Sequence, residues 1–443
     1  RARAAIASAS LGVDLGNLVV GRQRQLAGDY ATALAGDRNA LAAWESFLGR
    51  PIRPLVTVAG IFGYGLNTAG PAPAAAAPTF GAAAVAISGT SILIADRHSH
   101  QIAEVTADGQ LRPLTAVSKT DPTVAPAPPV PETGTPAITA LIPSPIAVAA
   151  DRQGNVFVTM SSAVDAPRNV VLMICAEPSP KFGFGRMQAG AIYRVAGGVD
   201  ARSGLAGFDG PAGLAVDDAG DLYVADRRND RIVRVSRETG IFEVVAARAP
   251  GARMSSDGDL PADGASLFMP AALAWRKTAT GEELFVLDAF YQRVRAVRKA
   301  GATWAGARVI TVAGSGAPVP SAGAPVVPGD FAGDGGPALS ARLHLAQVDT
   351  LDWRGSELPI GGLAVDGGRS VLYVADARNG RVRAIDLATG RIATVAGGGR
   401  SARDGIALDC RLSHPVGLAV APGGDVIVAD QGAHAVRRIV TAH

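Results

Sequence analysis

One sequence pattern recurs along most of this chain. Each copy has an apolar run, a turn rich in Gly and Asp, a second apolar run that ends in Asp, a short turn, and a third run in which Arg alternates with apolar residues. Residues 211–235 and 362–385 show the pattern most completely, and a fourth short run such as 392–397 follows. Short apolar runs between turn residues are typical of β-strands. Each copy therefore predicts a four-stranded antiparallel sheet.

Six copies can be counted, but the sixth has no fourth run before the sequence ends. Residues 55–60 match the fourth runs at 310–314 and 392–397, yet they precede every first run. A lone sheet cannot bury both of its faces, whereas sheets packed around an axis bury them and leave only short edges. The sequence thus predicts an all-β, six-bladed β-propeller over residues 51–443, with 55–60 as the strand that closes the last blade.

Residues 1–50 lie outside the repeats. Asp37 can cap a helix in which Leu41, Trp44 and Leu48 share one face. We expect a short N-terminal helical arm here. Two roles stay open for it: packing on the propeller, or docking onto another subunit.

The recurring line Gly-Leu-Ala-Val-Asp, then Leu-Tyr-Val-Ala-Asp, then Asn, Arg and Thr-Val-Ala-Gly resembles the NHL repeat. Residues 333–338 resemble the loop of the bacterial and teneurin-type version. The resemblance covers roughly 55–443 and weakens in blade two, where Thr159 stands in place of Asp, and in blade four, where 290–292 replace the usual turn. It implies a repeat protein with six blades, and an extracytoplasmic location (secreted, periplasmic or at the cell surface).

The charge pattern argues against nucleic acid as a partner. The formal net charge is only +3, and the basic residues are spread along the chain rather than gathered in one stripe. Two cysteines make neither a disulfide framework nor a metal-binding pair. No apolar run is long enough for a transmembrane segment. We therefore expect protein partners, with membership of a larger complex as an open alternative.

The Asp at the end of the second run, with the Asn and Arg that follow it, invites a catalytic interpretation. The same trio recurs from blade to blade, whereas a catalytic group is expected once. A carboxylate held by turn N–H groups and a neighbouring Arg forms a stable clamp. We predict structural clamps at Asp226, Asn229, Arg231, Asp376, Asn379 and Arg381.

The long connections between blades are the predicted binding surface. In a propeller they share one face with the turns between strands two and three, and loops on a rigid scaffold often carry binding residues. An alternative is that they only plug the central channel. The binding residues predicted on this face are Phe331, His344, Trp353 and His414.

A second candidate surface is the long hairpin tip of blade two, on the opposite face. Phe182, Phe184 and Arg186 lie in it, and Arg with aromatic residues is common at interfaces. The alternative is a loop that packs against the N-terminal segment.

Metal binding is not expected, because no histidine spacing supports it. The weak candidates are His344, His414 and Asp334, whose side chains suit zinc. Acidic loops leave calcium as a second weak candidate. The prediction is a chain without a cofactor.

These features together predict a non-catalytic binding or scaffold propeller that presents its long-loop face to a protein or glycan partner within an extracytoplasmic assembly. No catalytic residue is assigned. The alternative is a metal-dependent lyase or a lactonase of the same architecture, which needs His or acidic ligands around the axis. The first runs offer no such ring, since they begin with Pro145, Pro211, Pro270, Ile360 and Pro415.

Overall fold

The fold was established from a computed structural model. It describes residues 53–60, 72–74, 81–118, 128–162, 166–197, 207–248, 260–262, 267–299, 301, 303–315, 331–345 and 361–441. The helical arm expected over 1–50 and the candidate residue Trp353 lie outside these residues. No helix in the described part of the chain has the length and apolar character needed to cross a membrane.

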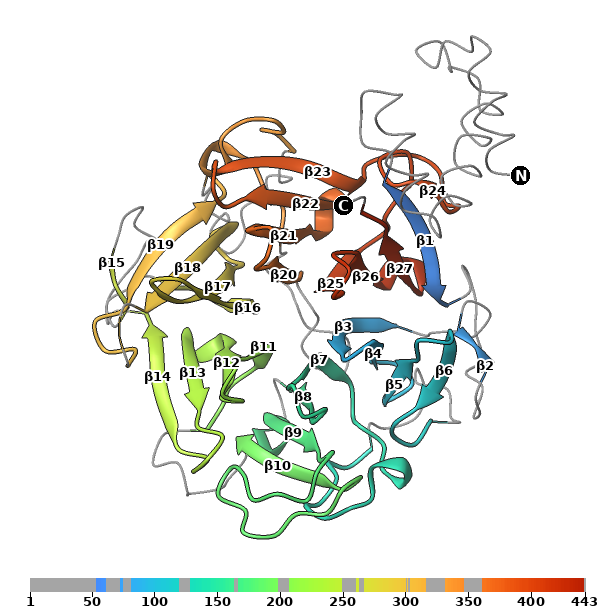
Figure 1. Cartoon of the computed structure of the whole chain (residues 1–443), viewed down its shortest axis with the longest axis vertical. Coiled ribbons are helices and arrows are strands. Elements are labelled where there is room, and N and C mark those ends of the chain that lie inside the picture. Colours follow the sequence, from blue (N-terminus) through green and yellow to red (C-terminus); the bar gives the residue numbers. More distant parts are fainter. Residues whose placement is uncertain are drawn as a thin grey trace.

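Six antiparallel sheets stand around a common axis, which confirms the predicted all-β six-bladed propeller (Figure 1). From the axis outward, blade one holds β3 (Ala82–Ser88), β4 (Ser91–Asp96), β5 (Gln101–Val105) and β6 (Gln110–Pro113). Blade two holds β7 (Pro145–Ala150), β8 (Val156–Met160), β9 (Val170–Ile174) and β10 (Ile192–Gly197). Blade three holds β11 (Pro211–Val216), β12 (Leu222–Asp226), β13 (Arg231–Val235) and β14 (Phe242–Ala247).

The remaining blades follow the same order. Blade four holds β16 (Pro270–Thr278), β17 (Gly281–Asp288), β18 (Arg293–Lys299) and β19 (Arg308–Ala313). Blade five holds β20 (Leu363–Asp366), β21 (Val371–Asp376), β22 (Arg381–Asp386) and β23 (Arg391–Gly397). Blade six holds β25 (Pro415–Val420), β26 (Val426–Asp430), β27 (Ala435–Ile439) and β1 (Pro54–Ala59). Short outer strands β2 (Ala72–Pro73), β15 (Leu260–Pro261) and β24 (Gly405–Ile406) flank blades one, four and six.

Blade six is built from both ends of the described chain. β1 pairs with β27, with Leu55 opposite Ile439 and Thr57 opposite Arg437. In Figure 1 the blue β1 lies beside the red β27. No hairpin turn joins these two strands, whereas β18 and β19 of blade four are consecutive in the chain. We call the junction between blades five and six the seam.

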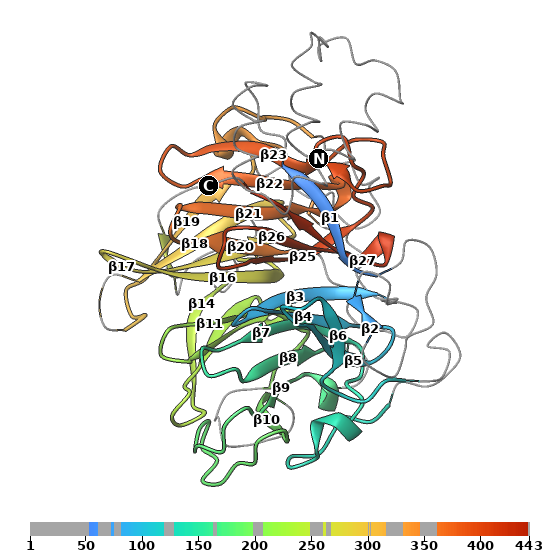
Figure 2. The same cartoon turned by 45° about the vertical axis from the view of Figure 1, so that its right-hand side comes forward.

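The hydrophobic core lies between consecutive blades rather than within any one of them. One cluster, for example, joins Tyr223 and Ile232 of blade three to Leu284 and Val297 of blade four. Figure 2 shows neighbouring blades side by side, and the apolar clusters join side chains of consecutive blades. This arrangement removes apolar area from water on both faces of each sheet.

The inner strands approach one another so closely that glycine is required within two of them and directly before a third. A Cβ on Gly213 would lie 2.6 Å from Ala272 Cα, and one on Gly417 would lie 2.8 Å from Ala84 Cα. One on Gly362 would lie 2.8 Å from the Val416 carbonyl oxygen. The Gly in the repeated Gly-Leu-Ala line therefore sets how tightly the ring closes around its axis.

The register of blade two corrects one expectation. Met160 of β8 lies opposite Pro145, as Asp226 lies opposite Pro211 in blade three. Met160 rather than Thr159 thus holds the place of the repeated Asp, because β8 continues one residue beyond Thr159.

Candidate functional site

The described parts of the blade-to-blade connections and the turns between strands two and three lie on one face, which we call the loop face. The backbone N–H of His344, in the connection into blade five, donates to Asp376 Oδ1 at 2.8 Å. The N–H of Arg378, in the turn of that blade, donates back to the His344 carbonyl at 3.1 Å. His414 and Asp430 show the same arrangement in blade six, with a distance of 2.8 Å.

Asp226 anchors the loop face in blade three. Its carboxylate accepts hydrogen bonds from the Asp209 N–H at 2.8 Å, from Asn229 Nδ2 at 2.9 Å and from Arg231 Nε at 2.6 Å. Burial raises the pKa of this carboxyl, and these partners oppose the rise. These three donors occupy the buried carboxylate, which therefore holds the turn and is not open to a ligand.

Blade five differs from this scheme at its Arg. Asn379 Nδ2 donates to Asp376 Oδ2 at 2.9 Å, but the nearest guanidinium is that of Arg383, whose Nη1 lies 3.8 Å from the same oxygen. Arg381 instead donates to the Asn379 carbonyl at 2.8 Å. Its guanidinium carbon lies 3.8 Å from the centre of the Phe331 ring. The clamp predicted for Arg381 is thus replaced by a cation–π contact, because Phe331 from the incoming connection covers that position.

Buried arginines at the third position of strand three were missed in the sequence. Arg383 is fully buried, and its guanidinium donates to Asp334 Oδ1 at 2.7 Å and to the Arg342 carbonyl at 3.0 Å. Arg437 makes the equivalent contacts with Asp404 at 3.1 Å and with the Arg411 carbonyl at 3.2 Å. These side chains tie each incoming connection to the blade it enters. The sequence feature that could have identified these ion pairs is an Asp-Gly pair in the connection combined with an Arg at the third position of strand three in the blade that follows.

The weak metal candidates occupy unsuitable surroundings. Burial lowers the pKa of His344 and of His414, and the charge of Arg378 lowers both further. A metal ion at these imidazoles would lie near that guanidinium and be repelled by it. Asp334 is already ion-paired with Arg383. Within the described ranges, no group of three or more His, Cys, Asp or Glu could hold a metal ion.

The axis offers little room and little polar chemistry. The cavity there measures about 70 Å³ and is lined by inner-strand residues such as Ala83, Ala147, Gly213 and Leu418. Arg227 is the charged side chain among the described residues that line it. A ring of acidic or imidazole ligands, which the enzyme alternative needs, is not found among these residues.

An aromatic cluster on the loop face was also missed. The ring centre of Phe268 lies 4.3 Å from that of Phe290 and 5.9 Å from that of Tyr291. The Arg248 guanidinium carbon lies 4.6 Å from the Phe268 ring centre, and Arg248 Nη1 donates to Asp230 at 3.1 Å. Phe268 and Phe290 are both partly exposed. We call Arg248, Phe268, Phe290 and Tyr291 the aromatic cluster.

The hairpin tip of blade two lies on the opposite face, against blade three. The N–H groups of Phe182 and Gly183 donate to the carbonyls of Arg237 and Glu238. Phe182 is only 3% exposed, and its ring meets Phe157 edge-on at 5.7 Å. Phe182 therefore belongs to the core and is not open to a partner, which corrects the expectation for this residue. Phe184 is half-buried and packs edge-on against Tyr193, whereas Arg186 is exposed.

In blade four the altered turn leaves Asp288 with fewer hydrogen-bond donors than Asp226 has in blade three. Phe290, Tyr291 and Gln292 supply no counterpart of Asn229, and Asp288 Oδ1 accepts only the Phe268 N–H, at 3.1 Å, among the hydrogen bonds of the described residues. Burial raises the pKa of Asp288 to about 7, while Arg295 and Arg293 oppose part of this rise. The Asp288 carboxyl consequently titrates near neutral pH.

The raised pKa predicts a pH-dependent stability. Between about pH 4 and 7 the folded protein holds a proton on Asp288 that the unfolded chain has released. This contribution to stability is complete below about pH 4 and is lost as the pH rises through about 7. Because of Asp288, the unfolding free energy of the wild type should fall by up to about 1.4 kcal/mol for each pH unit between about pH 4 and 7. Asp288→Asn cannot take up this proton, so we expect the variant to lack this part of the slope. Urea denaturation at several pH values measures it, with exposed Asp386→Asn as control, and an unchanged slope would contradict it.

Comparison with known proteins agrees with the repeat pattern. The family model of the NHL repeat matches residues 208–234 and 412–439. The curated protein SUPPRESSOR OF QUENCHING 1, chloroplastic, of Arabidopsis thaliana is 34% identical over 82 residues, which is 18% of this chain and 8% of that protein. The match thus spans less than a tenth of that relative.

Solved structures share the fold at low sequence identity. An auxiliary nutrient binding protein from Bacteroides thetaiotaomicron VPI-5482 superposes with a TM-score of 0.56 at 13% identity, over 87% of this chain and 75% of that one. An auxiliary nutrient binding protein from Bacteroides ovatus ATCC 8483 does so with a TM-score of 0.53 at 14% identity, over 87% and 76%. At such identities the likeness shows a common fold alone.

Proposed function

Since this chain is a six-bladed β-propeller of NHL repeats, we propose that it is a non-catalytic binding module whose loop face holds a protein partner. The aromatic cluster is the observation that carries this proposal. It gathers two partly exposed Phe rings, a Tyr and an Arg at the junction of blades three and four. Aromatic and Arg side chains contribute most of the binding free energy in many protein interfaces.

Blade five adds a second anchor on the same face. Phe331 is 37% exposed, and the guanidinium carbons of Arg381 and Arg383 lie 3.8 and 4.9 Å from the centre of its ring. A ring held in this way loses little conformational freedom when a partner covers it. His344 and His414 belong to the same face, where their backbone contacts fix the turns. We propose this face as the partner surface, with the propeller serving as one subunit of an extracytoplasmic assembly.

The comparisons are compatible with this proposal. Two structural neighbours are named as auxiliary nutrient binding proteins, so the architecture serves binding elsewhere. Fold alone does not give function, and the proposal therefore depends on the loop face. The axis, lined by small apolar side chains, provides no set of convergent acids and imidazoles among the described residues.

Differential capture tests the proposal. The full chain is immobilised and exposed to a periplasmic or secreted fraction of its source, and retained proteins are quantified by mass spectrometry. We expect the double variant Phe268→Ser, Phe290→Ser to retain at least about thirtyfold less of the partner than the wild type does. Phe184→Ser, on the opposite face, is the matched control and should retain it.

Three results would contradict the proposal. Equal capture by all three proteins would place the interface elsewhere. Competition by a soluble oligosaccharide alone would identify a glycan in place of a protein. Turnover of a lactone by the wild type, lost on chelation, would support the enzyme alternative.

A further inference from the structure

The hairpin tip of blade two contains a buried lysine whose hydrogen-bond acceptors are neutral. Lys181 keeps only 1% of its surface exposed. Its Nζ donates to Asn155 Oδ1 at 3.2 Å and to the Glu177 carbonyl oxygen at 3.3 Å. In the described part of the chain, this ammonium forms no ion pair with an Asp or Glu. Burying an ammonium without a carboxylate is costly, so packing alone does not explain why a lysine stands here.

A thiol shares one acceptor with this amine. Cys175 Sγ donates to the same Glu177 carbonyl oxygen at 2.9 Å, and the Ser179 N–H donates to it at 2.8 Å. A carbonyl oxygen has two lone pairs, so the three donors compete for it. Sγ and Nζ lie no farther apart than the sum of their distances to this oxygen, 6.2 Å. A nucleophilic sulfur and a primary amine therefore stand side by side inside the tip.

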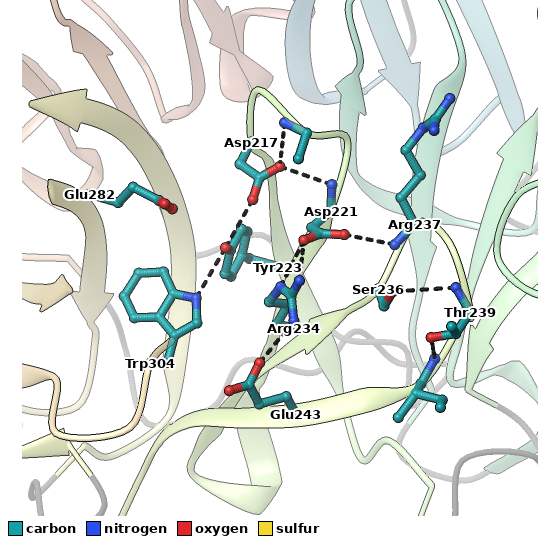
Figure 3. A network of polar contacts seen from close by, with 12 residues as sticks. Asp217, Asp221, Tyr223, Arg234, Ser236, Arg237, Thr239, Glu243, Glu282 and Trp304 are labelled. Carbon is teal, nitrogen blue, oxygen red and sulfur yellow. Dashed lines mark hydrogen bonds and ion pairs between the residues drawn. The ribbon is translucent and has the colours of Figure 1, made fainter. Parts of the chain in front are cut away.

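The backbone is fixed on both sides of this pair. The Cys175 N–H donates to the Ala191 carbonyl at 2.9 Å. Phe182, which follows the lysine, donates its N–H to the Arg237 carbonyl of blade three. Figure 3 shows that Arg237 is itself anchored, because its N–H donates to Asp221 at 2.8 Å. These contacts keep the thiol and the lysine as neighbours, and the long lysine side chain supplies the freedom to close the remaining distance.

The pair lies next to the surface and in a favourable electrostatic setting. Ala176, Glu177 and Pro178, which directly follow the thiol in the chain, are exposed. Burial raises the pKa of Cys175, and the nearby charge of Lys181 opposes this rise. The thiolate is the form of cysteine that reacts with peroxides. The lysine thus favours the reactive form of the sulfur beside which it stands.

The second cysteine of the chain has different surroundings. Cys410 is also 1% exposed, and its Sγ donates to the Arg403 carbonyl at 3.2 Å. Burial raises the pKa of Cys410 to about 11, and the charge of Arg437 opposes this rise. A guanidinium stays protonated in proteins and offers no free amine. Cys410 is therefore an internal control: a buried thiol beside a cation that cannot form a bond with it.

We propose that Cys175 and Lys181 form a redox-sensitive modification site, at which a peroxide joins the two side chains through a covalent Sγ–Nζ bond. In the first step an Sγ–O bond forms, the O–O bond of hydrogen peroxide breaks, and the thiol proton leaves with the second oxygen as water. The sulfur loses two electrons and the peroxide gains them. The product is a sulfenic acid, Sγ–OH.

The second step needs no further oxidant. Lys181 first releases its ammonium proton to solvent, and its amine then attacks the sulfur. The Sγ–OH bond breaks, and the hydroxyl leaves with one amine proton as water, which gives a sulfenamide. Two molecules of an added thiol reverse the step: they become a disulfide and return the Cys175 thiol and the Lys181 amine. The site lies on the face opposite the loop face and is independent of the proposed partner binding.

Peptide mass spectrometry on the full chain tests the proposal. The reduced protein is treated with millimolar hydrogen peroxide, denatured with an alkylating agent present, and digested. We expect Cys175 to be linked to Lys181, with a product lighter than the reduced peptide by two hydrogen atoms, or about 2 Da. Trypsin should fail to cleave after the linked Lys181, because its amine no longer carries a charge. Dithiothreitol should restore both the mass and the cleavage, and Cys410 should remain free for alkylation.

A variant separates the bond from the charge. Lys181→Arg keeps a cation beside the thiol but has no amine that attacks sulfur, so we expect at least about tenfold less cross-link. The sulfenic acid of Cys175 should then accumulate and be trapped by dimedone, which a purely structural role of the lysine would not produce. Lys299→Arg is the matched control, since Lys299 Nζ is paired with Glu282 at 2.8 Å, and it should cross-link as the wild type does.

Three results would overturn the proposal. The first is oxidation of Cys175 to sulfinic acid while Lys181 stays free. The second is equal oxidation of Cys175 and Cys410 without a cross-link. The third is a Cys175 thiol that stays unmodified at a peroxide concentration that oxidises free cysteine. All three are read from the wild type, so the test stands even where Lys181→Arg does not fold.

Discussion

Trp304→Ala is expected to lower the free energy of unfolding by about 3–5 kcal/mol, the range for removing a large aromatic side chain from a core. Trp304 is 4% exposed and packs between blades three and four. Its loss also removes the hydrogen bond from Nε1 to the Tyr223 hydroxyl. Lys299 Nζ, 5.4 Å from the ring centre, loses a cation–π partner as well. The surrounding strands are held by their own ladders and cannot collapse into the space.

Chemical denaturation of wild type and variant measures this loss. Trp304→Phe is the matched control, because it keeps a ring in the junction and should retain more than half of the stability that Trp304→Ala removes. Free indole should raise the melting temperature of Trp304→Ala and leave that of the wild type unchanged, since a ligand that binds only the folded state stabilises it. A loss below about 0.5 kcal/mol, the level of a typical surface change, would show that the indole is not part of the core.

Arg383→Met is expected to cost about 3–5 kcal/mol, because it removes one partner of a buried ion pair and leaves the other in place. Arg383 is fully buried, and it reaches two connection carbonyls, at Ala332 and Arg342, in addition to Asp334. Methionine has a similar length but no donor. The carbonyls would then remain buried without this guanidinium, and Asp376 would lose the cation 3.8 Å away.

The same denaturation experiment tests this, with Arg152→Met as control. Arg152 pairs with Asp218 on the surface, with 70% of its side chain exposed, and such pairs contribute about 1 kcal/mol or less. Limited proteolysis adds a local readout, since the connection around Phe331 should become the first site of cleavage in Arg383→Met. Equal stability of the two variants would mean that Arg383 does not hold this connection.

Several features of the site could be inferred from sequence because they are local. The Asp and Asn of a turn lie three residues apart, so their side chains can reach one another within the turn. Asp226 and Asn229 are hydrogen-bonded in this way. The Arg of the same turn was harder to place, since Arg381 is drawn to Phe331, which lies fifty residues earlier in the chain. A contact across that separation leaves no periodic signal.

The aromatic cluster also joins residues from separate segments, which the sequence pattern did not connect. Phe268 lies in a connection and Phe290 in a turn of the same blade, while Arg248 ends the preceding blade. Phe290 stands in a turn that departs from the repeat, but Phe268 and Arg248 belong to no motif, so the cluster is not distinguished until the loop face brings the three together. Phe182 is the opposite case: an aromatic residue in a surface hairpin that the neighbouring blade covers.

The sequence alone determined the repeat, the strand order within each blade and the number of blades, because alternating apolar residues and turn glycines act over a few positions and recur six times. Only the tertiary structure decided which of the described connections meet on the loop face and which arginines are buried. Arg383, for example, donates to the carbonyls of Arg342 and Ala332, which lie 41 and 51 residues earlier in the chain. Such contacts depend on packing between distant segments, and no local pattern of residues encodes them.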